Sequence, residues 1–158
     1  MKQLSYRTLR EIGYDGYLLE NAPEKVLQFG EGNFLRAFVE YWFDVSNEKA
    51  AWNGKCVLVQ PTDRNPGLAG CINQQEGLYT LYLRGRENGE KVDRKRVISS
   101  VSRCLNPYEK VDFNAMLEVA ASDSLEYVVS NTTEAGIVYD PACQPEDRPA
   151  SSFPGKLT

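Results

Sequence analysis

The sequence predicts an α/β protein built on a parallel sheet, with an antiparallel hairpin inserted into it. Short apolar segments alternate with segments of helical periodicity, an order typical of parallel strands joined by right-handed helical crossovers. Between the second and third of these strands, two further strand-like segments flank a cluster of turn residues, which predicts the hairpin.

The first third of the chain predicts an arm, a strand and a helix. Residues 1–24 are mixed in character, and we expect an arm with about one helical turn. The apolar run 25–29 ends at Gly30 and predicts a buried strand. Residues 34–47 contain no glycine or proline and predict a helix, with Asn33 at its N-cap. Its wide apolar surface is expected to be core and consists of Phe34, Leu35, Phe38, Val39, Tyr41, Trp42, Phe43 and Val45.

The middle of the chain predicts a strand, a loop and the hairpin. Residues 55–60 form an apolar run that Pro61 stops, typical of a second buried strand. Glycine and proline punctuate residues 61–77, which we interpret as a loop. Residues 78–84 and 96–101 are predicted to pair as hairpin strands, with turn chemistry at 87–90. The basic residues of the hairpin are expected to form a solvated edge that blocks strand addition: Arg84, Arg86, Arg94, Lys95 and Arg96.

The last predicted elements are a helix and a third buried strand. Asn106-Pro107 opens a helical segment, and the face expected to be buried consists of Phe113, Met116, Leu117 and Ala120. Residues 125–130 predict the strand. Three parallel strands are half of the six in a Rossmann-type sheet, so we expect the sheet to be incomplete at the C-terminus. We therefore divide the chain into an arm, 1–24, and a Rossmann-type domain, 25–158.

Charge and hydropathy exclude several classes of protein. The 158 residues include 18 basic and 22 acidic side chains, a net charge of −4 that disfavours a nucleic-acid binder. No apolar run approaches the roughly 20 residues needed to span a bilayer, and the N-terminus shows no signal-peptide pattern. We therefore expect a cytoplasmic protein.

Histidine and cysteine usage limits the chemistry. The chain has no histidine, so no imidazole serves as a general base or a metal ligand. Its four cysteines, Cys56, Cys71, Cys104 and Cys143, are separated by 15, 33 and 39 residues, a spacing that does not support a zinc site. We expect four reduced thiols, with Cys56 buried in a strand, and no metal site.

The strongest local motif is a glycine loop between the first strand and the first helix. Residues 30–36 read GEGNFLR. Gly30 permits a tight turn, Gly32 lets a pyrophosphate approach the backbone, and the following helix offers free N–H groups to that anion. The third glycine of the general fingerprint is replaced by Leu35, and a Gly-x-Gly without phosphate contacts is also a common turn. Arg36 is placed to approach the phosphates or, alternatively, to pair on the surface with Glu40.

Two further polar segments follow predicted strands. An acidic residue after the second strand usually binds the adenosine ribose, and Asp63 is the nearest candidate because Gln60 ends the strand. Asp63 is equally suited to stabilising a turn, and the adjacent Arg64 leaves a 2′-phosphate contact, and so NADP, open. Residues 130–136, SNTTEAG, follow the third strand, where ligands of parallel sheets bind. The alternative for them is a polar turn ending at Gly136.

The sequence around the glycine loop resembles one dehydrogenase family. Residues 26–39, VLQFGEGNFLRAFV, are similar to the cofactor loop of the polyol-specific long-chain dehydrogenases, the mannitol dehydrogenase family. Residues 77–80, 130–137 and 152–158 agree with it, so the resemblance covers residues 25–158. It implies an N-terminal Rossmann-type domain followed by a larger helical domain.

The resemblance also implies an activity and a set of binding residues. The activity is NAD-dependent interconversion of D-altronate and D-tagaturonate in hexuronate breakdown. The family's Gly-x-Gly-x-Phe-x-Arg pattern matches Gly30, Gly32, Phe34 and Arg36, and its adenosine-side acid matches Asp63. The full predicted NAD-binding set is Gly30, Gly32, Asn33, Phe34, Arg36, Asp63, Asn131, Thr132, Thr133 and Glu134. The family's catalytic lysine, asparagine and histidine have no counterparts here, so no catalytic residue is assigned and the chain alone is expected to be inactive.

The sequence alone leaves other functions open. Fructuronate reductase and mannitol 2-dehydrogenase activities belong to the same family, and their substrate choice would be made mostly by the second domain. A non-catalytic binding or assembly module would also suit a glycine turn without phosphate contacts, and a Rossmann-like methyltransferase ranks below it. The partner is expected to be a small sugar acid, neither nucleic acid nor membrane. If the second domain is missing, the apolar surface of the first helix and the edge of the sheet are expected to be left exposed, and the domain is then expected to self-associate or to be poorly soluble.

Overall fold

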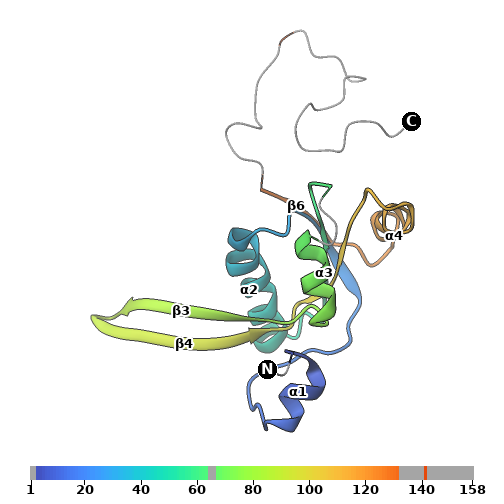
Figure 1. The fold of residues 1–158 in the computed structure, drawn as a ribbon. Helices are drawn as coiled ribbons and strands as arrows, with labels where there is room; N and C mark the ends of the chain where they lie inside the picture. Colours follow the sequence, from blue (N-terminus) through green and yellow to red (C-terminus); the bar gives the residue numbers. More distant parts are fainter. Residues whose placement is uncertain (1–2, 64–66, 132–140, 142–158) are drawn as a thin grey trace.

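A computed structural model describes residues 3–63, 67–131 and 141 and confirms the α/β class (Figure 1). The elements in chain order are α1 (Tyr6–Glu11), β1 (Glu24–Phe29), α2 (Asn33–Ala50), β2 (Lys55–Val59), α3 (Gly67–Gln74), β3 (Tyr79–Glu87), β4 (Glu90–Ile98), β5 (Val101–Leu105), α4 (Lys110–Ala120) and β6 (Tyr127–Ser130).

The main sheet has four parallel strands in the order β5-β2-β1-β6. From β1 the chain passes outward through β2 to β5, and it then returns to place β6 on the other side of β1. The strand order therefore reverses between β1 and β6, and such a switch point is where open α/β sheets bind their ligands.

Alternating side chains of the strands fill two apolar layers. Val26, Cys56 and Leu58 face α3 with its buried Ala69 and Ile72. The neighbouring positions in the same strands, Leu27, Val57 and Val59, face α4 on the opposite side of the sheet, with its buried Met116 and Val119. Cys56 is fully buried, as predicted, and the described cysteines Cys56, Cys71 and Cys104 are free thiols, whereas Cys143 lies outside the described residues. Helices thus cover both faces of the sheet (Figure 1).

The prediction of three parallel strands was wrong, because residues 96–101 belong to two strands in different sheets. β4 ends at Ile98 and β5 begins at Val101. Ser99 and Ser100 lie between them and are fully buried. Helix α2 satisfies both: the Ser99 N–H donates to Asp44 Oδ1 (2.8 Å), and Ser100 Oγ donates to the Glu40 carbonyl (2.8 Å). These bonds stabilise the change of direction between β4 and β5, which is not apparent from the strand-like sequence of residues 96–101.

The loop predicted for residues 61–77 contains helix α3. Ala69 and Ile72 bury this short helix against the sheet. Its start is capped by the buried Gln60 side chain, whose Oε1 accepts from the Ala69 N–H at 3.3 Å. The helix therefore depends on a residue seven positions before it, which local glycine and proline content does not reveal.

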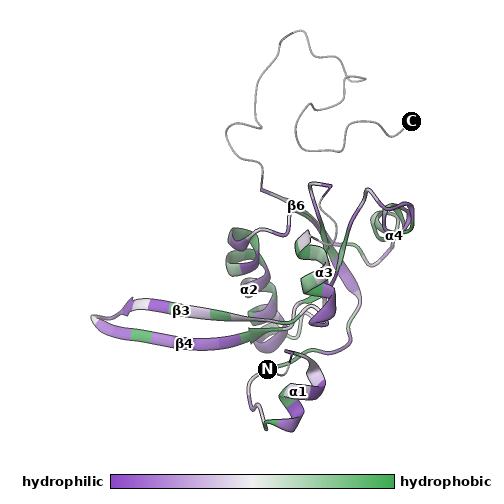
Figure 2. Cartoon of the chain, in the orientation of Figure 1, coloured by the Kyte–Doolittle hydropathy of each residue, from purple (hydrophilic) through white to green (hydrophobic). Residues whose placement is uncertain are grey.

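Helix α2 has the predicted position, but only part of its predicted apolar surface is buried, and several polar residues are buried with it. It begins at Asn33 with Gly32 as N-cap, so the prediction of Asn33 as the cap was wrong. Its buried residues are Leu35, Glu40, Asp44 and Asn47, whereas Phe34, Phe38 and Trp42 are exposed by 62, 54 and 54%. Figure 2 shows how apolar and polar residues alternate along its turns. The prediction of a buried aromatic stripe was therefore wrong for these three rings, whereas Phe43 packs against the core of the sheet.

The last two elements also differ from their predictions in burial. Helix α4 buries Met116 and Val119, while Leu117 and Ala120 are exposed. Strand β6 was predicted to be buried, yet Tyr127 and Val128 are more than half exposed. The reason is its place at the edge of the described sheet, where no further strand covers it.

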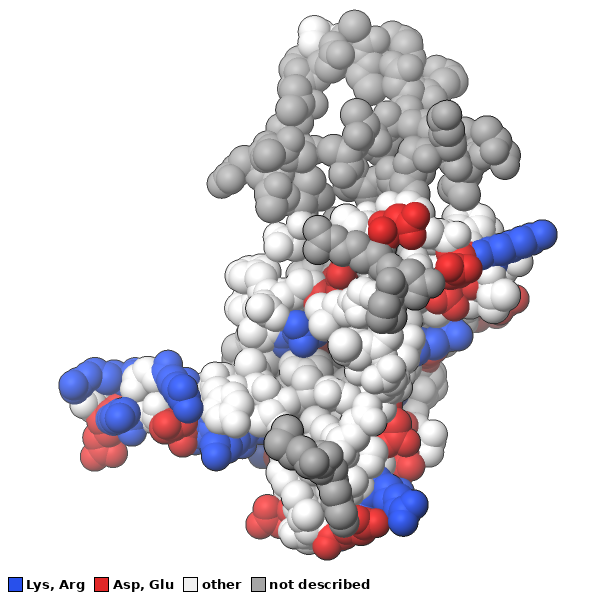
Figure 3. Space-filling view, viewed as in Figure 1, with Lys and Arg blue, Asp and Glu red and all other residues white. Residues whose placement is uncertain are grey.

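The arm and the hairpin form a third apolar cluster. Tyr6 and Leu9 of α1 pack with Leu78 and Val97 at the base of the hairpin. The hairpin turns at Asn88-Gly89, inside the predicted turn, and projects from the body of the molecule (Figure 1). Figure 3 shows basic and acidic side chains interleaved along it.

One basic residue of the hairpin is not solvated as predicted. Arg96 donates to Asp44 Oδ2 from Nε (2.7 Å) and to Glu48 Oε2 from Nη1 (2.7 Å), and its side chain is 20% exposed. It therefore fastens the hairpin base to α2.

None of the helices within the described ranges has the length and apolar character to span a bilayer.

Candidate functional site

Three of the segments predicted to bind a cofactor meet at one edge of the sheet. The strand pairing sets Phe29 beside both Val59 and Ser130, so β1, β2 and β6 end at the same level. The glycine loop, Asp63 and Asn131 follow these three strands. Asn131 and Asp63 are exposed there, whereas Arg64, Thr132, Thr133, Glu134 and Gly136 lie outside the described residues.

The backbone conformation at position 30 requires glycine. Its φ of +112° lies where side chains are strongly disfavoured, and an added Cβ would come within 3.2 Å of Leu35 Cδ1. Its N–H donates to the Val59 carbonyl at 2.9 Å, which links the end of β1 to the end of β2. Gly30 therefore makes the turn that leads the chain into α2.

Gly32 is not required by the backbone, because its φ of −66° and ψ of 163° are ordinary extended values. A Cβ built on it would meet no described atom within 4 Å. As the N-cap of α2 it offers no side chain, and the first N–H groups of a helix have no partners within the helix. The 18-residue helix therefore presents an open, uncapped N-terminus with its positive dipole end at the sheet edge.

Arg36 folds back onto the loop. Its Nε donates to the Glu31 carbonyl (2.9 Å) and its Nη2 to Asn33 Oδ1 (2.5 Å), and its guanidinium lies over the Tyr79 ring. The alternative of a surface pair with Glu40 was wrong, since Glu40 is fully buried and bonded elsewhere. Arg36 thus supports the loop from within and adds positive charge beside it.

Beneath the loop lies a buried pair that sequence reasoning missed. Gln28 is fully buried in β1, and its Nε2 donates to the Gly30 carbonyl (2.9 Å) and to Glu40 Oε1 (2.5 Å). Burial raises the pKa of Glu40 to about 7, against the opposing effects of its hydrogen bonds and of Arg36. The available signal was a glutamine inside an apolar strand, two residues before Gly30.

The second strand ends in a structural residue. Gln60 is buried, and its Nε2 donates to the Thr62 carbonyl at 2.7 Å while its Oε1 caps α3. It takes the position where many dinucleotide sites carry an acid, but its side chain points into the fold. Asp63 lies in the exposed turn that follows. Within the described part of this turn, it supplies the carboxylate at this edge of the sheet.

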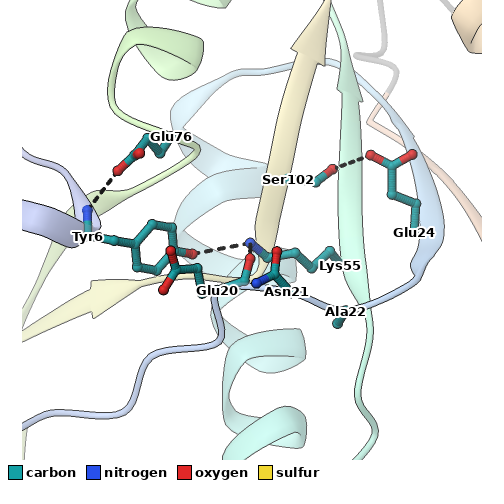
Figure 4. A pocket seen from close by; sticks show the side chains of 8 residues that line it. All are labelled: Tyr6, Glu20, Asn21, Ala22, Glu24, Lys55, Glu76 and Ser102. Atoms are coloured by element: carbon teal, nitrogen blue, oxygen red, sulfur yellow. Dashed lines mark hydrogen bonds between the residues drawn. The ribbon is translucent and has the colours of Figure 1, made fainter.

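A hollow of about 490 Å³ lies at the opposite, amino-terminal edge of the sheet (Figure 4). Lys55, at the start of β2, donates from Nζ to Tyr6 Oη (3.1 Å) and to the Glu20 carbonyl (3.0 Å). Glu76 accepts from the Tyr6 N–H (2.7 Å), and Glu24 accepts from Ser102 Oγ (2.8 Å). Burial lowers the pKa of Lys55, although Glu20 and other neighbouring acids act against it. These groups satisfy one another and fasten the arm to the sheet.

Comparisons with known proteins agree on one family. Residues 24–154 match the family described as the mannitol dehydrogenase Rossmann domain. Altronate oxidoreductases are similar over most of the chain: that of Bacteroides thetaiotaomicron is 47% identical over 136 residues, and that of Bacillus subtilis is 46% identical over 145 residues. These matches cover 86% and 92% of this chain but 28% and 29% of the relatives, so the chain spans less than a third of their length.

Solved structures show the same fold. Mannitol 2-dehydrogenase of Pseudomonas fluorescens, in a ternary complex with NAD and D-mannitol, matches with a TM-score of 0.70 and 23% identity over 85% of this chain and 27% of that one. A substrate-free D-sorbitol dehydrogenase matches with a TM-score of 0.65 and 22% identity over 85% of this chain and 28% of that one. The family match and the strand order together show that the chain belongs to the mannitol dehydrogenase family, of which it forms the Rossmann domain.

Proposed function

We propose that the chain is the NAD-binding part of an oxidoreductase that interconverts D-altronate and D-tagaturonate, the reaction of a tagaturonate reductase. The observation that carries NAD binding is the open position at Gly32, before an uncapped helix at the switch point of the sheet. The substrate pair is proposed from the names of the altronate oxidoreductases that the chain resembles.

We propose separate roles for the residues at this edge. The backbone amides that begin α2, from Asn33 and Phe34, bind the pyrophosphate that Gly32 admits. Arg36 holds the loop and adds positive charge, and Asp63 accepts from the adenosine ribose hydroxyls. Asn131, Thr132, Thr133 and Glu134 contribute further contacts to the same cofactor. Bound NAD supplies hydride transfer, and the chain's residues orient it.

We propose that the proton donor to the substrate oxygen lies outside this chain. Reduction of a ketone requires an acid at oxygen as well as hydride at carbon. The chain matches less than a third of the length of its relatives, which leaves most of their residues without counterparts here. We therefore expect the chain alone to bind NAD without converting a sugar acid.

A titration with NADH, followed by fluorescence, tests the binding proposal. Wild-type chain should bind saturably, Gly32→Ala more weakly, and Gly32→Asp not at all, because its carboxylate enters the phosphate position. Gly85→Ala is the matched control, since a Cβ at that exposed hairpin glycine also meets no described atom within 4 Å. Equal binding by wild type and Gly32→Asp, or no binding by folded wild type, would leave a non-catalytic module as the better description.

Two further arms of the experiment address specificity. NADPH in place of NADH tests whether Asp63 rejects a 2′-phosphate, as a carboxylate at the ribose should. The substrate is tested by measuring turnover of D-tagaturonate, fructuronate and fructose by a protein that has the full length of the relatives. Preference for fructuronate or fructose would replace the altronate assignment with fructuronate reductase or mannitol 2-dehydrogenase.

We also propose that this chain self-associates. The exposed rings of Phe34, Phe38 and Trp42 on α2 leave apolar surface in the described fold, as do Tyr127 and Val128 on β6, the strand at the edge of the described sheet. Surface of this kind favours association.

A further inference from the structure

The Gln28 side chain connects the glycine loop to the middle of α2. It is fully buried, and both protons of its Nε2 are used: one bond goes to the Gly30 carbonyl at 2.9 Å and the other to Glu40 Oε1 at 2.5 Å. Because Gly30 is the turn of the loop, the orientation of its peptide depends on where this amide is held. Glu40 is itself fixed from outside α2, since its carbonyl accepts from Ser100 Oγ at 2.8 Å.

The same two side chains hold two unsatisfied oxygens. Gln28 Oε1 and Glu40 Oε2 are buried and have no hydrogen-bond partner among the described residues. An ionised carboxylate and an amide oxygen are both acceptors, so neither can satisfy the other. A proton on Glu40 Oε2 supplies the missing donor. The carboxylic acid and the amide are then complementary, each with one donor and one acceptor for the other.

The surroundings of Glu40 favour the neutral acid. Burial is the largest influence on the Glu40 pKa and raises it to about 7, while Arg36 is the nearby cation that lowers it. The titratable groups that face Glu40 from β2, β3 and β5 are Cys56, Tyr79 and Cys104. Burial raises the pKa of all three, so they are neutral near pH 7 and contribute no cation. Asp44, one turn along α2, is engaged by Arg96 and Ser99.

We propose that Gln28 and Glu40 are a positioning pair for dinucleotide binding, in which the protonated carboxyl and the amide exchange two hydrogen bonds and fix the Gly30 carbonyl. When Glu40 releases its proton to solvent, one of these bonds is lost, two acceptor oxygens oppose each other, and the loop is held less firmly. The affinity for the dinucleotide therefore falls as pH rises through neutrality. This proposal rests on the proposed NAD binding.

Two variants at one position separate positioning from simple support of the fold. Glu40→Gln keeps the size of the side chain and, as an amide, donates to Gln28 Oε1 at every pH. Glu40→Ala removes both bonds. With NADH as probe, we expect wild-type affinity to weaken about tenfold between pH 6 and pH 8.5, the equivalent of one hydrogen bond. Glu40→Gln should bind as wild type does at pH 6 and stay constant, and Glu40→Ala should bind weakly at both pH values.

A measurement without ligand decides the proposal if NADH binding itself fails. In ¹H–¹⁵N spectra of the free chain, the amide signals of Gly30 and Gly32 should shift with a midpoint near pH 7 in wild type. They should not shift in Glu40→Gln. Absence of NADH binding by every variant would contradict the proposed function, and the spectra would still report on the pair. Loop signals that do not titrate, or that titrate equally in Glu40→Gln, would overturn the positioning pair.

Discussion

The two glycines of the loop serve different purposes, and their backbone angles show it. Gly30 has a positive φ and bonds to β2, so it is needed for the chain to turn. Gly32 has ordinary angles and open space where a side chain would be, so its lack of a side chain matters only to something outside the described chain. We therefore assign Gly30 to folding and propose Gly32 for binding.

Gly30→Ala should therefore mainly lower folding stability, whereas Gly32→Ala should mainly weaken dinucleotide binding. Gly30→Ala should lower the free energy of unfolding by about 1–3 kcal/mol, the usual cost of a strained backbone conformation. Gly32→Ala should lower it by less than about 1 kcal/mol, because alanine is a poorer N-cap than glycine but adopts these backbone angles without strain. Urea unfolding followed by circular dichroism measures both, and equal destabilisation by the two would refute the division of roles.

The buried Glu40 should make stability depend on pH. Its folded pKa of about 7 lies above the usual carboxyl value of 4.5, so the folded state retains a proton that the unfolded state releases. The free energy of unfolding should therefore fall as pH rises from about 4.5 to 7, by up to about 3 kcal/mol in total, and level off above.

Glu40→Gln isolates this effect from the other titrating groups. The difference in unfolding free energy between Glu40→Gln and wild type, from urea unfolding at pH 5 and pH 8, should favour the variant more at pH 8. A difference that is the same at both pH values would show that Glu40 is ionised in the folded protein throughout.

Helix α2 shows why its position could be predicted and its orientation could not. Freedom from glycine and proline and the apolar spacing located the helix correctly. Its polar face is buried because each of its members has a partner outside the helix: Gln28 for Glu40, Arg96 and Ser99 for Asp44, and Gly54 for Asn47. Hydrophobic periodicity depends only on the residues of the helix itself. It cannot show that Arg96 of the hairpin pairs with Asp44.

The buried ion pair between α2 and the hairpin base should be important for stability. Asp44→Ala should lower the free energy of unfolding by about 3–5 kcal/mol, because it leaves Arg96 without its buried partner and the Ser99 N–H without an acceptor. The control is Asp93→Ala, which removes an exposed pair with Arg84 and should cost less than about 1 kcal/mol. Thermal or urea unfolding measures both, and similar losses would mean that α2 and the hairpin are not coupled through Asp44.

At the scale of the whole molecule, the fold class and the sheet edge where the candidate binding segments meet could be predicted, and the number of strands could not. Apolar runs ending at Gly30 and Pro61 located β1 and β2 and therefore the edge where their following loops meet. Strand β5 was missed because Ser99 and Ser100 are small and continue a strand-like run while the chain changes sheets. The buried Gln28 beneath the loop was missed because its partner Glu40 is identified only by packing.

The exposed apolar surface should make the chain associate with itself. Light scattering should show a mass that increases with concentration, and Phe38→Ser with Trp42→Ser should reduce that increase because these two rings are more than half exposed on α2. The control is Tyr82→Ser, which removes an exposed ring from the hairpin. A constant monomer mass at high concentration would contradict the proposal.

Dinucleotide binding at the carboxyl edge of the sheet is the central proposal, and ¹H–¹⁵N spectra recorded with increasing NAD examine it residue by residue. We expect the amide signals of Gly32, Asn33 and Phe34 to shift most, followed by those of Asp63 and Asn131. Signals that stay unchanged there, or that shift instead around Lys55 and Ser102 at the opposite edge, would contradict it.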